Sequence, residues 1–108
     1  SQMIHLKNLK GVFYRDNGGR IDIAAPEGSL DNTTKNISLT GGVKAVTDDG
    51  TALSADGANW DNQRQVLAAI GHVILTREDT VLTGDQLESD VNMEKVKLQG
   101  NARIRKGG

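Results

Sequence analysis

The chain has 108 residues, with 13 glycines, one phenylalanine, one tyrosine, one tryptophan, no cysteine and a formal net charge of −1. This length supports one domain. The balanced charge gives no excess of basic residues of the kind that binds nucleic acid. Because there is no cysteine, disulfides and thiolate zinc sites are excluded. No apolar run approaches the roughly 18–20 residues that a membrane helix needs. We therefore expect one small domain with no nucleic-acid partner.

The first predicted strand begins near Lys10 and contains Gly11-Val12-Phe13-Tyr14. The Asp16-Asn17-Gly18-Gly19 segment that follows predicts a hairpin turn, because Asn, Asp and Gly tolerate positive φ. Asp48-Asp49-Gly50 predicts a second hairpin, and Arg77-Glu78-Asp79-Thr80 occupies the same place further along the chain. With no convincing amphipathic helix between these turns, we predict an all-β chain of about eight to ten short strands.

A pattern of three residues recurs three times along the chain. An aliphatic residue is followed eight positions later by aspartate and eighteen positions later by glycine. The sets are Ile23, Asp31 and Gly41; Leu53, Asp61 and Gly71; and Leu82, Asp90 and Gly100. Such repeats predict tandem units within a single domain. We place the units at about 10–40, 41–70 and 71–99, with a lead-in at 1–9 and a closing strand at 100–106.

The stretches around these glycines alternate apolar and polar side chains. Such alternation puts one side of a strand against apolar material and the other side in water. The apolar side carries Ile37, Leu39, Val43, Leu67, Val73, Leu75, Val96, Leu98 and Ile104. This face is either an ordinary closed core or a groove left open for acyl chains. Small residues and the central glycines leave room for a groove, whereas composition alone favours the closed core.

The repeated aspartates and the single tryptophan each have two interpretations. Three aligned carboxylates would form a cation-binding ladder, but Asp also stabilises turns by bonding to nearby backbone, and calcium-binding repeats carry a denser Gly/Asp pattern. We favour turns. Trp60 is expected to be a partly buried lid on the core, rather than a platform for a sugar or the entrance to a lipid-lined groove.

The sequence offers no constellation for catalysis or metal binding. His5 and His72 are the only histidines, and neither has neighbours at zinc-ligand spacing. The acidic pairs Asp48/Asp49 and Glu78/Asp79 fall in predicted turns, so we interpret them as solvated charges and not as glycosidase carboxylates. We therefore expect no enzyme activity, no metal and no cofactor.

The assembled pattern resembles the lipopolysaccharide-export proteins of the OstA-like superfamily, which include LptC-type and LptA-type members. The resemblance covers roughly residues 10–106 and is carried by four segments, at residues 53–61, 71–75, 82–90 and 96–102. They show the same order of an aliphatic-x-Ala/Gly-Asp segment, an Asp-centred turn and a Gly-x-Val strand. The opening Leu9-Lys-Gly-Val-Phe-Tyr segment looks more like the LptC type.

This resemblance implies a folded-over antiparallel sheet, or β-jellyroll, with an apolar interior. It implies that lipopolysaccharide or another acyl lipid binds there, against the nine residues named above. It also implies a periplasmic location, edge-to-edge strand pairing with other lipopolysaccharide-export proteins, and homo-oligomers as one form of such pairing. LptC-type members are anchored to the inner membrane by an N-terminal segment, which would lie outside this sequence.

Two other functions compete with the lipid carrier. The main alternative is a structural or assembly module with a closed core, which oligomerises through its sheet edges. A carbohydrate-binding β-solenoid would need exposed aromatic platforms, and three aromatic residues argue against it.

Overall fold

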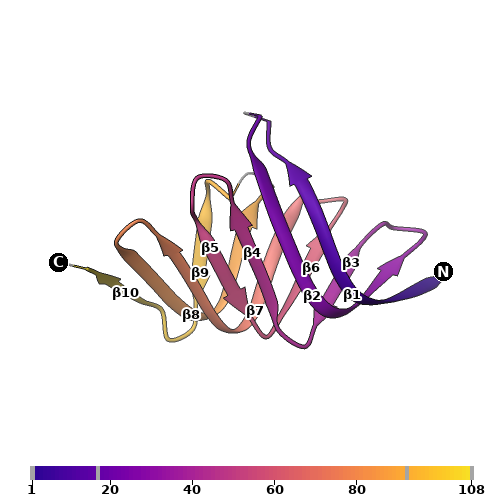
Figure 1. Cartoon of the computed structure of the whole chain (residues 1–108). Coiled ribbons are helices and arrows are strands. Elements are labelled where there is room, and N and C mark those ends of the chain that lie inside the picture. The colour runs from indigo at the N-terminus through magenta and orange to yellow at the C-terminus, as the bar shows by residue number, and fades with distance from the viewer. Residues whose placement is uncertain (1, 17, 92, 108) are drawn as a thin grey trace.

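The computed structural model describes residues 2–16, 18–91 and 93–107. These residues form one antiparallel sheet of ten strands and no helix (Figure 1). The strands are β1 (Met3–Tyr14), β2 (Arg20–Asp31), β3 (Ile37–Thr40), β4 (Val43–Thr47), β5 (Ala52–Ala55), β6 (Gly57–Asp61), β7 (Val66–Arg77), β8 (Thr80–Asp90), β9 (Val96–Gln99) and β10 (Arg103–Lys106). The predicted all-β, folded-over antiparallel sheet is confirmed. The described residues contain no helix long and apolar enough to cross a membrane.

The strands form seven rows across the sheet. The long strands β1, β2, β7 and β8 each make one row, and each of the other rows is made of two short strands in line: β3 with β4, β5 with β6, and β9 with β10. The order is β1, β2, β3–β4, β5–β6, β7, β8 and β9–β10. The predicted lead-in at 1–9 lies in β1, which pairs with β2 along its length.

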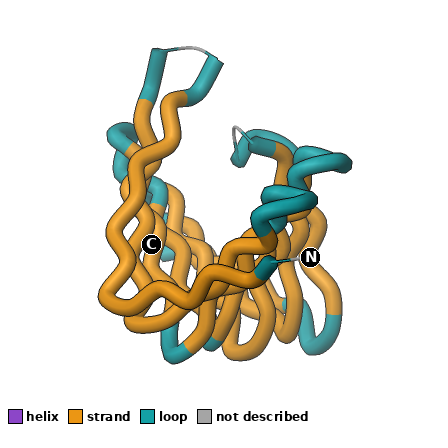
Figure 2. Tube along the Cα trace, turned by 90° about the vertical axis from the view of Figure 1, so that its right-hand side faces the viewer, coloured by secondary structure: helices purple, strands orange, loops and turns teal. Residues whose placement is uncertain are grey.

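Every row bends, so the sheet folds over into two facing layers, seen end-on in Figure 2. The β4 layer contains β4, β5 and β10, and the β6 layer contains β3, β6 and β9. The long strands pass through both layers: β2 pairs with β4 through residues 21–24 and with β3 through residues 27–30. The inward faces of the two layers enclose the hydrophobic core.

Three of the seven rows bend at the repeated glycines, β3–β4 at Gly41, β7 at Gly71 and β9–β10 at Gly100. Their φ angles are positive, at 85° for Gly41, 84° for Gly71 and 73° for Gly100. The residue after each one is also left-handed, with φ of 103° at Gly42, 48° at His72 and 49° at Asn101. Two successive left-handed residues redirect the strand, and glycine adopts the first position without steric cost.

The neighbouring row also requires glycine at these bends. A Cβ atom on Gly71 would lie 2.6 Å from the Asp56 carboxylate, and one on Gly100 would lie 2.7 Å from that of Asp85. At Gly41 the obstacle is Pro26, at 2.7 Å. The neighbouring row therefore explains why these positions are glycine, and room for a ligand in the interior stays a prediction.

The repeated aspartates are turn residues, as expected. Oδ1 of Asp31 accepts hydrogen bonds from the backbone N–H groups of Thr33 and Thr34, at 2.9 and 3.2 Å. These bonds lower the pKa of Asp31. Asp61 accepts from the same two positions further along the chain, and Asp90 accepts from the N–H groups four and five positions on, in a longer turn. No group of three or more His, Cys, Asp or Glu residues in the described ranges is placed to hold a metal.

The acidic hairpin between β4 and β5 is tied to the neighbouring hairpin by Arg15. This side chain is buried, and its Nη1 lies 3.4 Å from Asp49 Oδ2 and 3.7 Å from Asp48 Oδ1. The pKa of Asp49 is lowered, first by a hydrogen bond from the Thr47 hydroxyl and then by the Thr51 N–H. Asp49 therefore organises its own turn.

Candidate functional site

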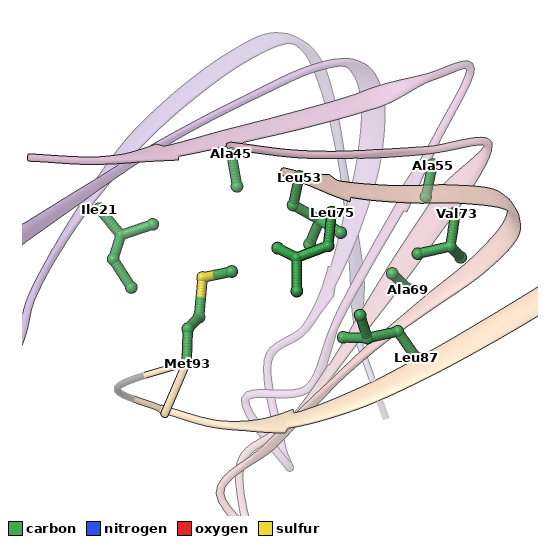
Figure 3. Close-up of a cluster of buried hydrophobic side chains, with 9 residues drawn as sticks. All are labelled: Ile21, Ala45, Leu53, Ala55, Ala69, Val73, Leu75, Leu87 and Met93. Carbon is green, nitrogen blue, oxygen red and sulfur yellow. The ribbon is translucent and has the colours of Figure 1, made fainter. Parts of the chain in front are cut away.

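The interior between the two layers is the candidate site, and it contains two packed clusters. The larger one brings together Ile21, Ala45, Leu53, Ala55, Ala69, Val73, Leu75, Leu87 and Met93, all between 0% and 8% exposed (Figure 3). The smaller one contains Ala25, Val43 and Ala58. Since alanines are frequent in both clusters, the two layers approach closely.

The inward side chains form ladders that cross the sheet from edge to edge. Residues directly opposite one another in neighbouring strands share a face, so the pairing identifies each ladder. In the β4 layer one ladder runs through Gly11, Ile23, Ala45, Leu53, Leu75, Leu82 and Ile104. In the β6 layer another runs through Leu6, Gly28, Leu39, Ala58, Ala69, Leu87 and Leu98. Neither ladder contains a polar side chain.

The nine predicted lining residues differ in burial. Val43, Val73 and Leu75 are buried members of the clusters. Partly buried residues packed against the clusters are Leu39, Leu67, Val96 and Leu98.

The other two lie near the rims of the interior. Ile37 is half-buried opposite Trp60 and lines a hollow with Met3. Ile104 pairs with Leu82 on the inner face but is 71% exposed, because β10 is an edge strand among the described residues. Contact of all nine residues with lipid stays a prediction.

The alternation around the glycines missed several core residues. Leu87 and Ile21 lie in long strands outside the three glycine-centred stretches. In β8, Leu87 shares a face with Ser89, but the buried face changes parity between Gly84 and Leu87, so simple alternation does not connect them. Met93 lies in the turn between β8 and β9, where no periodic signal exists. Phe13 belongs to the first predicted strand and packs against the larger cluster.

Two contacts close the open side of the interior, opposite the bends. The Phe13 and Trp60 ring centroids are 5.8 Å apart, and Trp60 is half-buried, as expected of a lid. Met93 reaches from its turn in the β6 layer toward Ile21 and Ala45 of the β4 layer (Figure 3) and is 1% exposed. Arg77 of the β4 layer donates from Nη2 to the Met93 carbonyl at 2.9 Å.

The bends carry a polar pair on the outside of the molecule. His72 Nδ1 lies 2.7 Å from Asp56 Oδ2, and both side chains are exposed. The hydrogen bond and the negative charge of Asp56 raise the pKa of His72. One bend further on, Asn101 Nδ2 donates to Asp85 Oδ2 at 2.9 Å. This arrangement makes His72 a bend residue whose imidazole bonds to the neighbouring row.

Comparison with known proteins gives a family match and a structural match over nearly the whole chain. The family model described as "Lipopolysaccharide-assembly, LptC-related" matches residues 1–106. A similar solved structure is that of LptH from Pseudomonas aeruginosa, described as the LptA-homologous periplasmic component of the conserved lipopolysaccharide transport device. The two share a TM-score of 0.67 and 7% sequence identity, over 99% of this chain and 96% of that chain. At this identity the likeness establishes the fold. No curated protein matches the chain by sequence.

Proposed function

Since the chain belongs to the LptC-related family of lipopolysaccharide-assembly proteins, we propose that it holds lipopolysaccharide acyl chains between its two layers and passes them to a similar domain. Membership confirms the predicted resemblance to OstA-like export proteins. It makes the protein a non-enzymatic, periplasmic component of lipopolysaccharide transport. Anchoring to the inner membrane, as in LptC-type members, belongs to the proposal.

The observation that carries the proposal is the uninterrupted apolar ladder from Gly11 to Ile104. It crosses seven rows about 4.8 Å apart, a path of roughly 30 Å. It ends at the exposed Ile104, where nothing in the described residues covers the inner face. Such a path suits an alkyl chain that moves along the interior and leaves at a sheet edge. The same edge offers backbone groups for strand addition by a second domain.

Photo-crosslinking tests this path. A photoreactive amino acid is placed at Leu98 or Ile104, which face inward, and at their neighbours Lys97 and Arg103, which face outward in the same strands. With purified lipopolysaccharide, the inward positions should give clearly higher adduct yields. Equal yields within both pairs would show that the interior does not hold the lipid.

A closed-core assembly module remains the second candidate, favoured by the close packing of the larger cluster. Its residues leave the interior filled by side chains, with exposed fractions of 8% or less. This function predicts no lipid adducts at Leu98, and association through the sheet edges that lipid does not change. Adducts at Leu98 would exclude it.

A further inference from the structure

Charge is divided unevenly between the edges and the middle of the sheet. Residues 1–15 and 95–108 contain eight of the 13 lysines and arginines and no aspartate or glutamate. All 14 acidic residues lie between positions 16 and 94, together with only five basic ones. The small net charge of the chain therefore conceals two basic ends and an acidic centre.

The fold places these basic ends at the two edges of the sheet. One edge row is β1, with Lys7 and Lys10, and the other is β9–β10. The four cations of the β9–β10 row are Lys97, Arg103, Arg105 and Lys106.

These edge cations are not neutralised by ion pairs within the described part of the chain. The ion pairs found there involve Arg15, Arg20 and His72. Two edge lysines do face a carboxylate across the adjacent row, Lys7 opposite Glu27 and Lys97 opposite Glu88.

The remaining edge cations face uncharged residues. Lys10 lies opposite Ala24 in β2. In β10, Arg103, Arg105 and Lys106 lie opposite Thr83, Val81 and Thr80. All four are exposed. One of the two cations in β1 and three of the four in the β9–β10 row are therefore available to a strand added there.

We propose that the basic edges select a partner chain whose edge strand is acidic, and that they disfavour pairing between two copies of this chain. This inference rests on the edge-to-edge joining in the proposed function. Joining two copies would set β1 of one beside β9–β10 of the other, with cations on both strands. Like charges opposite each other in a sheet destabilise the pairing, and unfavourable charge contacts exclude wrong partners. Carboxylates on the added strand would meet Arg103 and Arg105 instead.

Charge reversal at one edge tests the selection. The variant Lys7→Glu/Lys10→Glu has an acidic β1 and a basic β10, so it should associate head to tail with itself. Its control, Lys44→Glu/Arg64→Glu, makes the same change in net charge within inner rows and turns. In sedimentation velocity at about 10 mM salt, where charges act over roughly 30 Å, the edge variant should associate roughly tenfold or more tightly than the unmodified chain. The control should stay monomeric.

Reversal at both edges gives a complementary test. The variant Lys7→Glu/Lys10→Glu/Arg103→Glu/Arg105→Glu has two acidic edges, so it should be monomeric alone and should associate when mixed with the unmodified chain. Salt at about 1 M, where screening leaves only roughly 3 Å of range, should dissolve that mixed complex.

The outcomes separate this inference from the proposed joining. If the unmodified chain associates at low salt as readily as the edge variant, or if the control variant associates equally, charge selection is overturned while joining stands. If no variant or mixture associates at either salt concentration, the joining itself is overturned and the inference falls with it.

Discussion

At three of the bends, single residues cannot be replaced without strain. Gly71 combines a left-handed φ of 84° with a neighbour that leaves no space for a Cβ atom. The substitution Gly71→Ala should therefore reduce the free energy of unfolding by about 1–3 kcal/mol. Urea unfolding followed by the fluorescence of Trp60 measures this change.

Gly11→Ala is the matched control, because a Cβ atom there meets nothing within 4 Å and its φ is not in the left-handed region. That change should be neutral, or stabilising by about 0.4–1 kcal/mol through the unfolded state. Equal losses at both glycines would contradict the role assigned to the bend.

The His72–Asp56 pair should make the bend sensitive to pH. Folding raises the pKa of His72. The stabilisation that the charged His72–Asp56 pair gives the fold is therefore fully present below the unfolded imidazole pKa of about 6.5. It is lost as the pH rises through the higher pKa of the folded state. His72→Asn is the informative variant, because Asn101 occupies the corresponding bend and bonds to Asp85. The stability difference between the chain and this variant should be larger near pH 5.5 than near pH 8.

All other ionisable groups are the same in both proteins, so the difference in stability isolates the His72–Asp56 pair. A stability difference that stays constant between the two pH values would show that the pair contributes nothing through its charge.

At the scale of elements, the turn between β8 and β9 closes the interior through Met93. Met93→Ala removes a buried side chain that touches the opposite layer, so the free energy of unfolding should fall by about 2–5 kcal/mol. The only other methionine, Met3, is 50% exposed, and Met3→Ala should stay within about 0.5 kcal/mol of the unmodified chain. Thermal unfolding of the two variants side by side measures the contrast.

Elements governed by local chemistry were predictable from the sequence, whereas those that depend on a distant strand were not. Asp31, Asp61 and Asp90 were assigned correctly, because an aspartate stabilises a turn through its own neighbours in the chain. The spacing of Gly71 was recognised but its role was not, since that role depends on Asp56 in the adjacent row. Met93 had no periodic signal, because its burial follows from the way the turn is placed over the other layer.

At the scale of the whole molecule, alternation predicted the inner face but not where the sheet ends. Ile104 lies on the inner face, as predicted. Its exposure follows from the position of β10 at the edge of the sheet, which alternation does not reveal. The folded-over shape came from the family resemblance and not from periodicity, because alternation does not distinguish a flat sheet from a bent one.

The thickness of the interior is also a property of the whole molecule. Ala69 is completely buried between the layers, so Ala69→Leu should force them apart and lower the free energy of unfolding by about 1–3 kcal/mol. Its neighbour in β7, Ala68, lies on the other face, opposite Asn59 and Glu88. Ala68→Leu should change stability by no more than about 0.5 kcal/mol. Similar melting temperatures for the two variants would argue against a closely packed interior.

The odd number of rows makes the two edges of the sheet run in the same direction. Rows alternate in sense and there are seven of them, so both edge rows run the same way, from the β6 layer to the β4 layer. Identically oriented domains placed in line, with their interiors continuous, must then meet through parallel strands, although every pairing inside each domain is antiparallel. Parallel pairing is slightly weaker per residue. An array of such domains would therefore have a fixed polarity and would separate at its junctions before any domain came apart.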